Sequence, residues 1–300
     1  MFAGIEIFQI QHVERLGRPF VNRLAPTRSF EADPDIESVL QVAPRLIHIL
    51  NHGPSLAPYV VGAYVAQEIV RAGGGQRVPF AAVHRNMFRL PIVKDLIARS
   101  LGARRAFTFE DVVNQFQNGN FTDFVLSPEG SNEMRGNPYE VRPFKSHRYI
   151  ELSIRLDIPM LLTAHRGTED WTLSLRFSDF TASLLSWMNP RMAQLLSFNQ
   201  TVNVQGVPTP LQQLRVKSLL YKPELKYDEL ADHPRQRQLQ LREESEKVRK
   251  ILSRMLGSLD ATYWGLSDTE FVTTEKEGAT PENGQPAEAE VQNATEAKPE

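Results

Sequence analysis

The sequence contains no cysteine, which excludes disulfide bonds, thiolate metal sites and cysteine nucleophiles. It has no apolar run of the roughly 18 residues that a membrane-spanning helix needs, so we expect no span. The formal net charge is only −2, and nothing in it favours a nucleic-acid partner. The Gly-x-Ser-x-Gly turn of hydrolases and the His-Glu-x-x-His spacing of zinc enzymes are also missing, and we expect no metal site.

What the sequence does contain is a regular alternation of apolar strands and helices. We expect helices at 55–72, 87–101, 109–118 and 143–156, and strands at 45–50, 78–83, 123–127 and 158–164. This order predicts an α/β fold with a mostly parallel sheet, helices on its faces and a C-terminal helical extension. The segment Pro26 to Pro34 reads as a loop. Trp171 to Phe177 and Thr201 to Val204 read as further strands.

Composition divides the chain into four parts. We expect a helical lead-in at 1–44, a main domain at 45–225, a helical extension at 226–272 and a disordered acidic tail at 273–300. Two stretches have alternative interpretations. Residues 8–24 and residues 180–198 each carry an apolar stripe, and each stripe either packs on the core or rests on a membrane surface.

The stretch from Arg45 to Ala57 is the most informative for function. An apolar run at 46–50 is followed by Asn51-His52-Gly53-Pro54, and Gly-Pro ends a strand and permits a helix to start. His52 is therefore placed at the usual ligand edge of an α/β sheet, where a neutral imidazole can act as a general base. The alternative is a turn residue whose ring is bonded to the backbone.

A second polar turn follows the expected strand at 123–127. Glu129 there can accept hydrogen bonds from hydroxyl groups, and Gly130 permits a close backbone approach before Ser131. The alternative is an ordinary polar turn.

Three basic residues are candidates for binding phosphate. Arg104 and Arg105 carry guanidinium groups that can hold a phosphate by two bonds, and Lys145 lies at the start of an expected helix. The alternative for each is a solvated side chain on the surface.

Taken in order, these motifs resemble those of the glycerolipid (lysophospholipid) acyltransferase superfamily, which includes the 1-acylglycerol-phosphate acyltransferases. The resemblance covers roughly residues 40 to 170. The matching segments are Asn51-His52, Gly102-Ala103-Arg104-Arg105, Pro128-Glu129-Gly130-Ser131, Phe144-Lys145 and Ile158-Pro159.

The resemblance implies transfer of an acyl group from acyl-CoA or acyl carrier protein to a hydroxyl of a glycerol phosphate or lysophospholipid. His52 would be the base. Arg104 or Arg105, Glu129, Gly130, Ser131 and Lys145 would bind the acceptor. The resemblance implies no cofactor beyond the donor and a cytoplasmic location with peripheral membrane contact. It leaves the oligomeric state open.

The chain departs from the family pattern in the first and third motifs. The family has an aspartate five residues after the histidine, and Ala57 stands there in this chain. Ser127, Ser131 and Asn132 stand where the family usually has Phe, Thr and Arg. The second hypothesis, favoured by Ala57, Ser131 and Asn132, is therefore a catalytically inactive relative that binds lipid or acyl carrier.

Overall fold

The structure is a computed structural model that describes residues 8–54, 56–82, 107–130, 140–188, 196 and 200–264, with only the backbone at 205 and 261–264. The chain divides into two units, Met1–Asp260 and Ala261–Glu300. All the described strands belong to the first. The expected helix at 87–101 and the expected disordered tail at 273–300 lie outside the described residues.

A six-stranded sheet forms the centre of the first unit. Four neighbouring strands run parallel, and at one side β8 pairs antiparallel with β5 and parallel with β1. In spatial order the strands are β1 (Arg28–Asp33), β8 (Leu214–Tyr221), β5 (Met160–Arg166), β2 (Leu46–Leu50), β4 (Asp123–Leu126) and β3 (Pro79–Ala81). The four strands expected from the sequence are confirmed as β2, β3, β4 and β5, all in this one sheet.

Two strands were not predicted. The segment expected to be a loop contains β1, and no strand was expected where β8 lies. β1 is an edge strand whose residues alternate between half-buried and exposed, and it has no apolar run. Its pairing partner lies far along the chain, so tertiary contact rather than local pattern fixes it as a strand. The expected lead-in at 1–44 therefore contributes to the central sheet.

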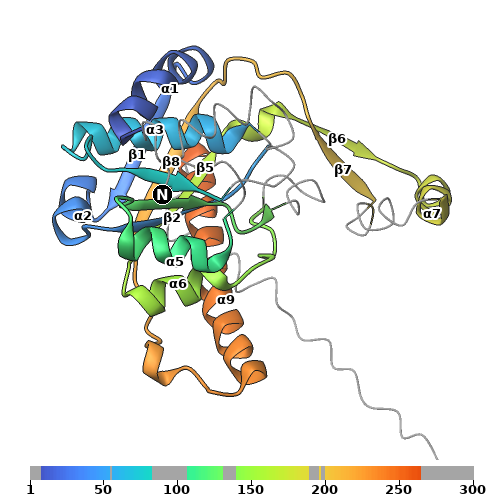
Figure 1. Ribbon diagram of the computed structural model, residues 1–300. Helices are drawn as coiled ribbons and strands as arrows, with labels where there is room; N and C mark the ends of the chain where they lie inside the picture. The colour runs from blue at the N-terminus through green and yellow to red at the C-terminus, as the bar shows by residue number, and fades with distance from the viewer. Residues whose placement is uncertain are drawn as a thin grey trace, which may run out of the picture. The chain divides into compact units, whose positions relative to one another are not determined.

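Helices cover both faces of the sheet (Figure 1), which confirms the α/β fold class. One face is covered by α1 (Ile10–Leu24), α2 (Ile36–Val42) and α3 (Ala57–Arg71). The other is covered by α5 (Phe109–Asn118), α6 (Arg148–Leu156) and α9 (Pro234–Trp264). α6 begins at Arg148, five residues later than expected from the sequence. α1 continues through Pro19, and it packs on α3.

Local sequence explains why these elements form where they do. Every residue of β2 is buried, as expected for the centre of a parallel sheet with helices on both faces. Thr108 and Asp111 form a capping box at the start of α5. In α9 the seven-residue repeat of Leu241, Val248 and Met255 is buried in the core, so this helix is part of the domain.

A second, two-stranded sheet pairs β6 (Thr172–Arg176) with β7 (Thr201–Gln205), and both strands were expected from the sequence. A short 3-10 helix, η3 (Thr168–Trp171), precedes β6, and α7 (Asp179–Met188) follows it. Another 3-10 helix, η4 (Tyr227–Glu229), precedes α9. The rest of the helical hairpin expected at 180–198 lies outside the described residues, apart from residue 196.

The topology marks one edge of the sheet as a binding edge. β2 and β4 are adjacent and parallel, yet β2 leads to α3 on one face and β4 leads to α6 on the other. The segments that follow their carboxyl ends therefore diverge. In open α/β sheets, ligands bind in the crevice where the connections part in this way.

Candidate functional site

His52 lies in the turn between β2 and α3, at the carboxyl edge of the sheet, and is half-buried. Gly53, the next residue, has a φ of +60°, a conformation that favours glycine. A Cβ atom at Gly53 would lie 2.8 Å from Cε1 of His165 and 3.1 Å from Oγ1 of Thr168. The turn is thus closely packed against the end of β5, and a side chain at 53 would displace it.

Glu129 fastens this turn to the segment that follows β4. It is only 2% exposed. One carboxylate oxygen accepts a hydrogen bond from the backbone N–H of His52 at 2.8 Å, and the other accepts one from the backbone N–H of Arg142, also at 2.8 Å. The prediction that His52 and Glu129 share one edge of the sheet is confirmed. Since both oxygens already have a partner, Glu129 holds the backbone around His52.

Opposing effects act on the pKa of the Glu129 carboxyl group. Burial raises the pKa of its carboxyl group above the ordinary value. The two backbone N–H groups, His52 and the Arg142 guanidinium oppose this increase but do not cancel it. The carboxylate therefore has a cost of desolvation that its hydrogen bonds only partly offset.

The ring of His52 is oriented by its own turn. Nδ1 lies 3.0 Å from the carbonyl oxygen of Gly53. A carbonyl oxygen can only accept, so this bond requires the hydrogen on Nδ1, and in the neutral imidazole Nε2 then carries the lone pair. Among the residues that the structure describes, none forms a hydrogen bond with Nε2. The ring is thus set in the tautomer that a general base needs at Nε2.

Asn51 and His165 brace the turn from the neighbouring strand. The side-chain oxygen of Asn51 accepts from the backbone N–H of His165 at 2.9 Å, and Nε2 of His165 donates to the Asn51 carbonyl at 2.9 Å. Nδ1 of His165 lies 3.2 Å from the Thr168 hydroxyl. Burial lowers the pKa of His165 to about 4, against the opposing effect of the hydrogen bond that its ring donates to the Asn51 carbonyl. His165 is therefore a neutral, fully bonded support for the Asn51–Gly53 turn.

The other expected binding residues are only partly within the described chain. Gly130 has a φ of +56°, and a Cβ there would meet Cδ of Lys145 at 3.4 Å. The backbone N–H of Lys145 donates to the Pro128 carbonyl at 3.0 Å, so Lys145 lies beside the Glu129 turn. Arg104, Arg105 and Ser131 lie outside the described residues.

Ala57 is the first residue of α3 and is fully buried. Its backbone N–H donates to the Pro54 carbonyl at 2.7 Å. In the described part of the chain the ring of His52 bonds to a backbone carbonyl and to no carboxylate. The departure at residue 57 therefore has a physical consequence, because a neutral carbonyl orients the ring without supplying a negative charge.

Two contributors to the site were missed by sequence reasoning. No motif marks His165, although its place just past the expected strand at 158–164 puts it at the same edge as His52. Arg142 is buried close to Glu129, and it forms an ion pair with Glu140 at 3.4 Å. Its Nη2 has no hydrogen-bond partner within the described residues. No sequence signal distinguished it from other arginines.

A different histidine–carboxylate pair lies deeper in the sheet. Nε2 of His48, in the middle of β2, is 2.7 Å from a carboxylate oxygen of Asp123, and both residues are buried. The other oxygen of Asp123 accepts from Arg77 at 2.8 Å and from Thr122 at 2.6 Å. Burial opposes ionisation of Asp123, but His48 and Arg77 outweigh it and lower its pKa.

Neither a metal cluster nor a membrane span is found in the described chain. No group of three or more His, Asp or Glu side chains among those residues is arranged to hold a metal ion. No helix within the same residues is both long enough and apolar enough to cross a membrane.

The chain was also compared with known proteins. No protein-family model matches it, and no curated protein matches it significantly.

Proposed function

We propose that the protein is an acyltransferase that moves an acyl group from a thioester donor to a hydroxyl of a glycerol phosphate or lysophospholipid. The observation that carries this proposal is the state of His52. Its Nδ1–H is held by the Gly53 carbonyl, its backbone is held by Glu129, and its Nε2 is left to accept a proton. The order of the sequence motifs around it supports the same chemistry.

In the proposed reaction, Nε2 of His52 takes the proton from the acceptor hydroxyl as the hydroxyl oxygen attacks the thioester carbonyl carbon. The new C–O bond forms, and the C–S bond then breaks. The proton returns from Nε2 to the departing sulfur, which leaves as the free thiol of CoA or of acyl carrier protein. The atoms balance without a further reactant.

Acceptor binding is assigned to cationic and turn residues at the same edge. Lys145 is placed beside Gly130 by the bond between its backbone N–H and the Pro128 carbonyl. A phosphate bound there would meet an ammonium group and, through Arg104 or Arg105, a guanidinium fork. Amphiphilic substrates of this class also call for contact with a membrane surface at the periphery.

The direct test is transfer of a labelled acyl group. Purified protein is incubated with acyl-CoA or acyl carrier protein as donor and with glycerol phosphate or a panel of lysophospholipids as acceptor. His52→Ala is assayed in parallel. We expect product with at least one donor–acceptor pair, and loss of about 10²- to 10⁴-fold in His52→Ala. Equal rates in the two proteins would refute the proposal.

A second candidate function is a non-catalytic module that binds lipid or acyl carrier. The observation in its favour is Ala57, a buried apolar residue at the position where the family has its orienting acid. Such a module would bind a lysophospholipid with the same affinity in wild type and His52→Ala, and neither protein would yield product.

A further inference from the structure

The two-stranded sheet has one apolar and one polar face. Leu173 is paired with Val204 and Leu175 with Val202, so these four side chains share a face. On the opposite face, the hydroxyl of Ser174 donates to the Asn203 side chain at 2.8 Å. Leu173 and Leu175 are exposed although they lie on the apolar face. An isolated pair of strands is marginally stable in water, and an apolar face left in water adds to that cost.

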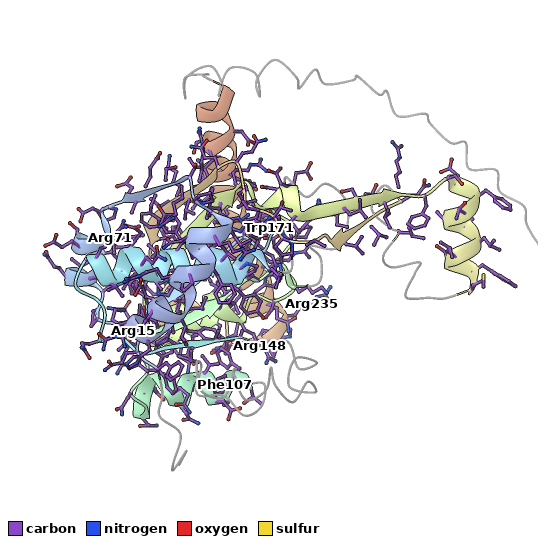
Figure 2. The ribbon with its side chains drawn as sticks, turned by 90° about the horizontal axis from the view of Figure 1, so that it is seen from above. Arg15, Arg71, Phe107, Arg148, Trp171 and Arg235 are labelled. Atoms are coloured by element: carbon purple, nitrogen blue, oxygen red, sulfur yellow. The ribbon has the colours of Figure 1, made fainter. Side chains whose placement is uncertain are left out.

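This sheet is fixed at one end by Trp171. The indole is buried in the main core, and its N–H donates to the Thr209 carbonyl at 2.8 Å. The Trp171 carbonyl accepts from the backbone N–H of Gly206 at 2.7 Å. Figure 2 shows Trp171 at one end of the β6–β7 ribbon and α7 at the other. α7 is thus carried on a ribbon whose base is anchored by buried contacts.

α7 presents a stripe of exposed apolar side chains, formed by Phe180, Leu184, Trp187 and Met188. Their spacing of four, three and one residues places them on one side of the helix. Phe180 is 80% exposed and Trp187 is 85% exposed. Ala182 is the buried residue of α7, and it packs with Val202 of β7 in a small separate cluster. The single charged residue of the helix is Asp179, at its start.

We propose that this stripe on α7 inserts into the interface of a lipid bilayer. A short helix with large apolar side chains and a tryptophan near its end suits the boundary between headgroups and acyl chains. The absence of charge along the stripe indicates that apolar burial drives the contact, so binding should persist at high salt.

A second copy of the chain fits the stripe less well. Large aromatic side chains such as Phe180 and Trp187 bury about 150–250 Å² each when fully covered. Leu184 and Met188 are smaller, and part of each of the four side chains is already covered. Their sum is below the roughly 800 Å² per partner that a stable protein interface needs. A bilayer has no such threshold, because each inserted side chain contributes independently.

The structure also distinguishes between the two apolar stripes that the sequence left open. Helix α1 packs along α3, and Ile10 and Val21 are buried in the core while Leu16 and Phe20 are exposed. All four side chains of the α7 stripe are exposed. We therefore assign the membrane contact to α7. This contact does not require acyl transfer, so its test is separate from the test of the proposed function.

The test is flotation with phosphatidylcholine vesicles at low and high salt. The variants are Phe180→Ser/Trp187→Ser on α7 and the matched control Leu16→Ser/Phe20→Ser on α1, each with circular dichroism to establish folding. We expect wild type and the α1 control to float at both salt concentrations and the α7 variant to lose at least tenfold in bound fraction. Failure of wild type to float, or flotation of the α7 variant like wild type, would overturn the proposal.

A second readout locates the contact at one residue. Fluorescence of the wild type should shift to shorter wavelength on addition of vesicles, because Trp187 leaves water. Trp187→Phe should still float but lose most of the shift. An unchanged shift in this variant would contradict insertion of α7. Elution of wild type as a dimer that the α7 double variant breaks would assign the stripe to a second copy and overturn the proposal as well.

Discussion

Two histidines on or just after β2 have a carboxylate nearby, and the two arrangements differ in which atoms meet. At His48 the carboxylate of Asp123 contacts the imidazole ring, and the guanidinium group of Arg77 shares that carboxylate. At His52 the carboxylate of Glu129 contacts the backbone N–H, and a carbonyl contacts the ring. His48 is buried within the sheet, whereas His52 is half-buried at its edge.

The difference shows that a close histidine–carboxylate pair does not by itself identify a site. The carboxylate of Asp123 contacts the His48 ring directly, yet both groups are buried and both carboxylate oxygens of Asp123 already have hydrogen-bond partners. The His52 ring has a weaker orienting partner but lies where the segments after β2 and β4 diverge. Position at the open edge of the sheet, rather than pairing with an acid, distinguishes the candidate base from the structural histidine.

The largest expected effect on stability is at the buried pair. Asp123→Ala leaves His48 and Arg77 without their shared carboxylate, and breaking a buried pair in this way costs about 3–5 kcal/mol. Urea unfolding measures the loss, with exposed Asp232→Ala as the control. A stable Asp123→Ala protein that has lost acyl transfer would show instead that this network belongs to the site.

The next effect is a pH dependence caused by His165. The unfolded chain takes up a proton near the ordinary pKa of 6.5, whereas burial keeps the folded residue neutral down to about 4. The unfolded state therefore binds more protons between these values, and stability falls as the pH is lowered from 6.5 to 4. At 1.36 kcal/mol per unit, the loss amounts to roughly 3 kcal/mol.

His165→Gln can still donate to the Asn51 carbonyl but has no titrating ring. Unfolding free energies measured across this pH range should therefore show a flatter slope in His165→Gln than in wild type. The exposed His233→Gln is the control and should keep the wild-type slope. Identical slopes in all three proteins would contradict the buried, neutral state assigned to His165.

The smallest expected effect is at residue 57. Ala57→Asp places a carboxylate at the start of α3, where it can replace the Gly53 carbonyl at Nδ1 of His52. A negative charge there stabilises the imidazolium that forms as the acceptor loses its proton. We expect a tenfold increase in kcat/KM, which corresponds to about 1.4 kcal/mol. Ala57→Asn matches the shape without the charge, and an equal increase in Ala57→Asn would refute the electrostatic explanation.

Sequence reasoning predicted four of the six strands of the central sheet, including those next to the candidate site. β2, β3, β4 and β5 have apolar runs bounded by turn residues, so local pattern was enough. β1 has no apolar run and pairs with β8, which lies far along the chain, and such long-range pairing leaves no local signal. β8 alternates buried and half-buried residues, which is a local strand pattern that was overlooked, and it pairs with both β1 and β5.

Part of the candidate site was also predicted. The positions of His52 and Glu129 at one edge of the sheet followed from strand ends and turn residues. The hydrogen bonds that Glu129 accepts from the backbone of His52 and Arg142 were not predicted, because a sequence shows which residue is present and not which atoms it contacts. The buried support from Asn51 and His165 was hidden for the same reason. Arg104, Arg105 and Ser131 remain predictions.

The central claim is that His52, and not His48, is the base of an acyl transfer. Its most direct test compares kcat/KM for His52→Ala and His48→Gln with the wild type, at a temperature where all three are folded. We predict a loss of about 10²- to 10⁴-fold in His52→Ala and a loss of less than about tenfold in His48→Gln, since that residue acts on stability. Equal kcat/KM in His52→Ala and wild type would contradict the account.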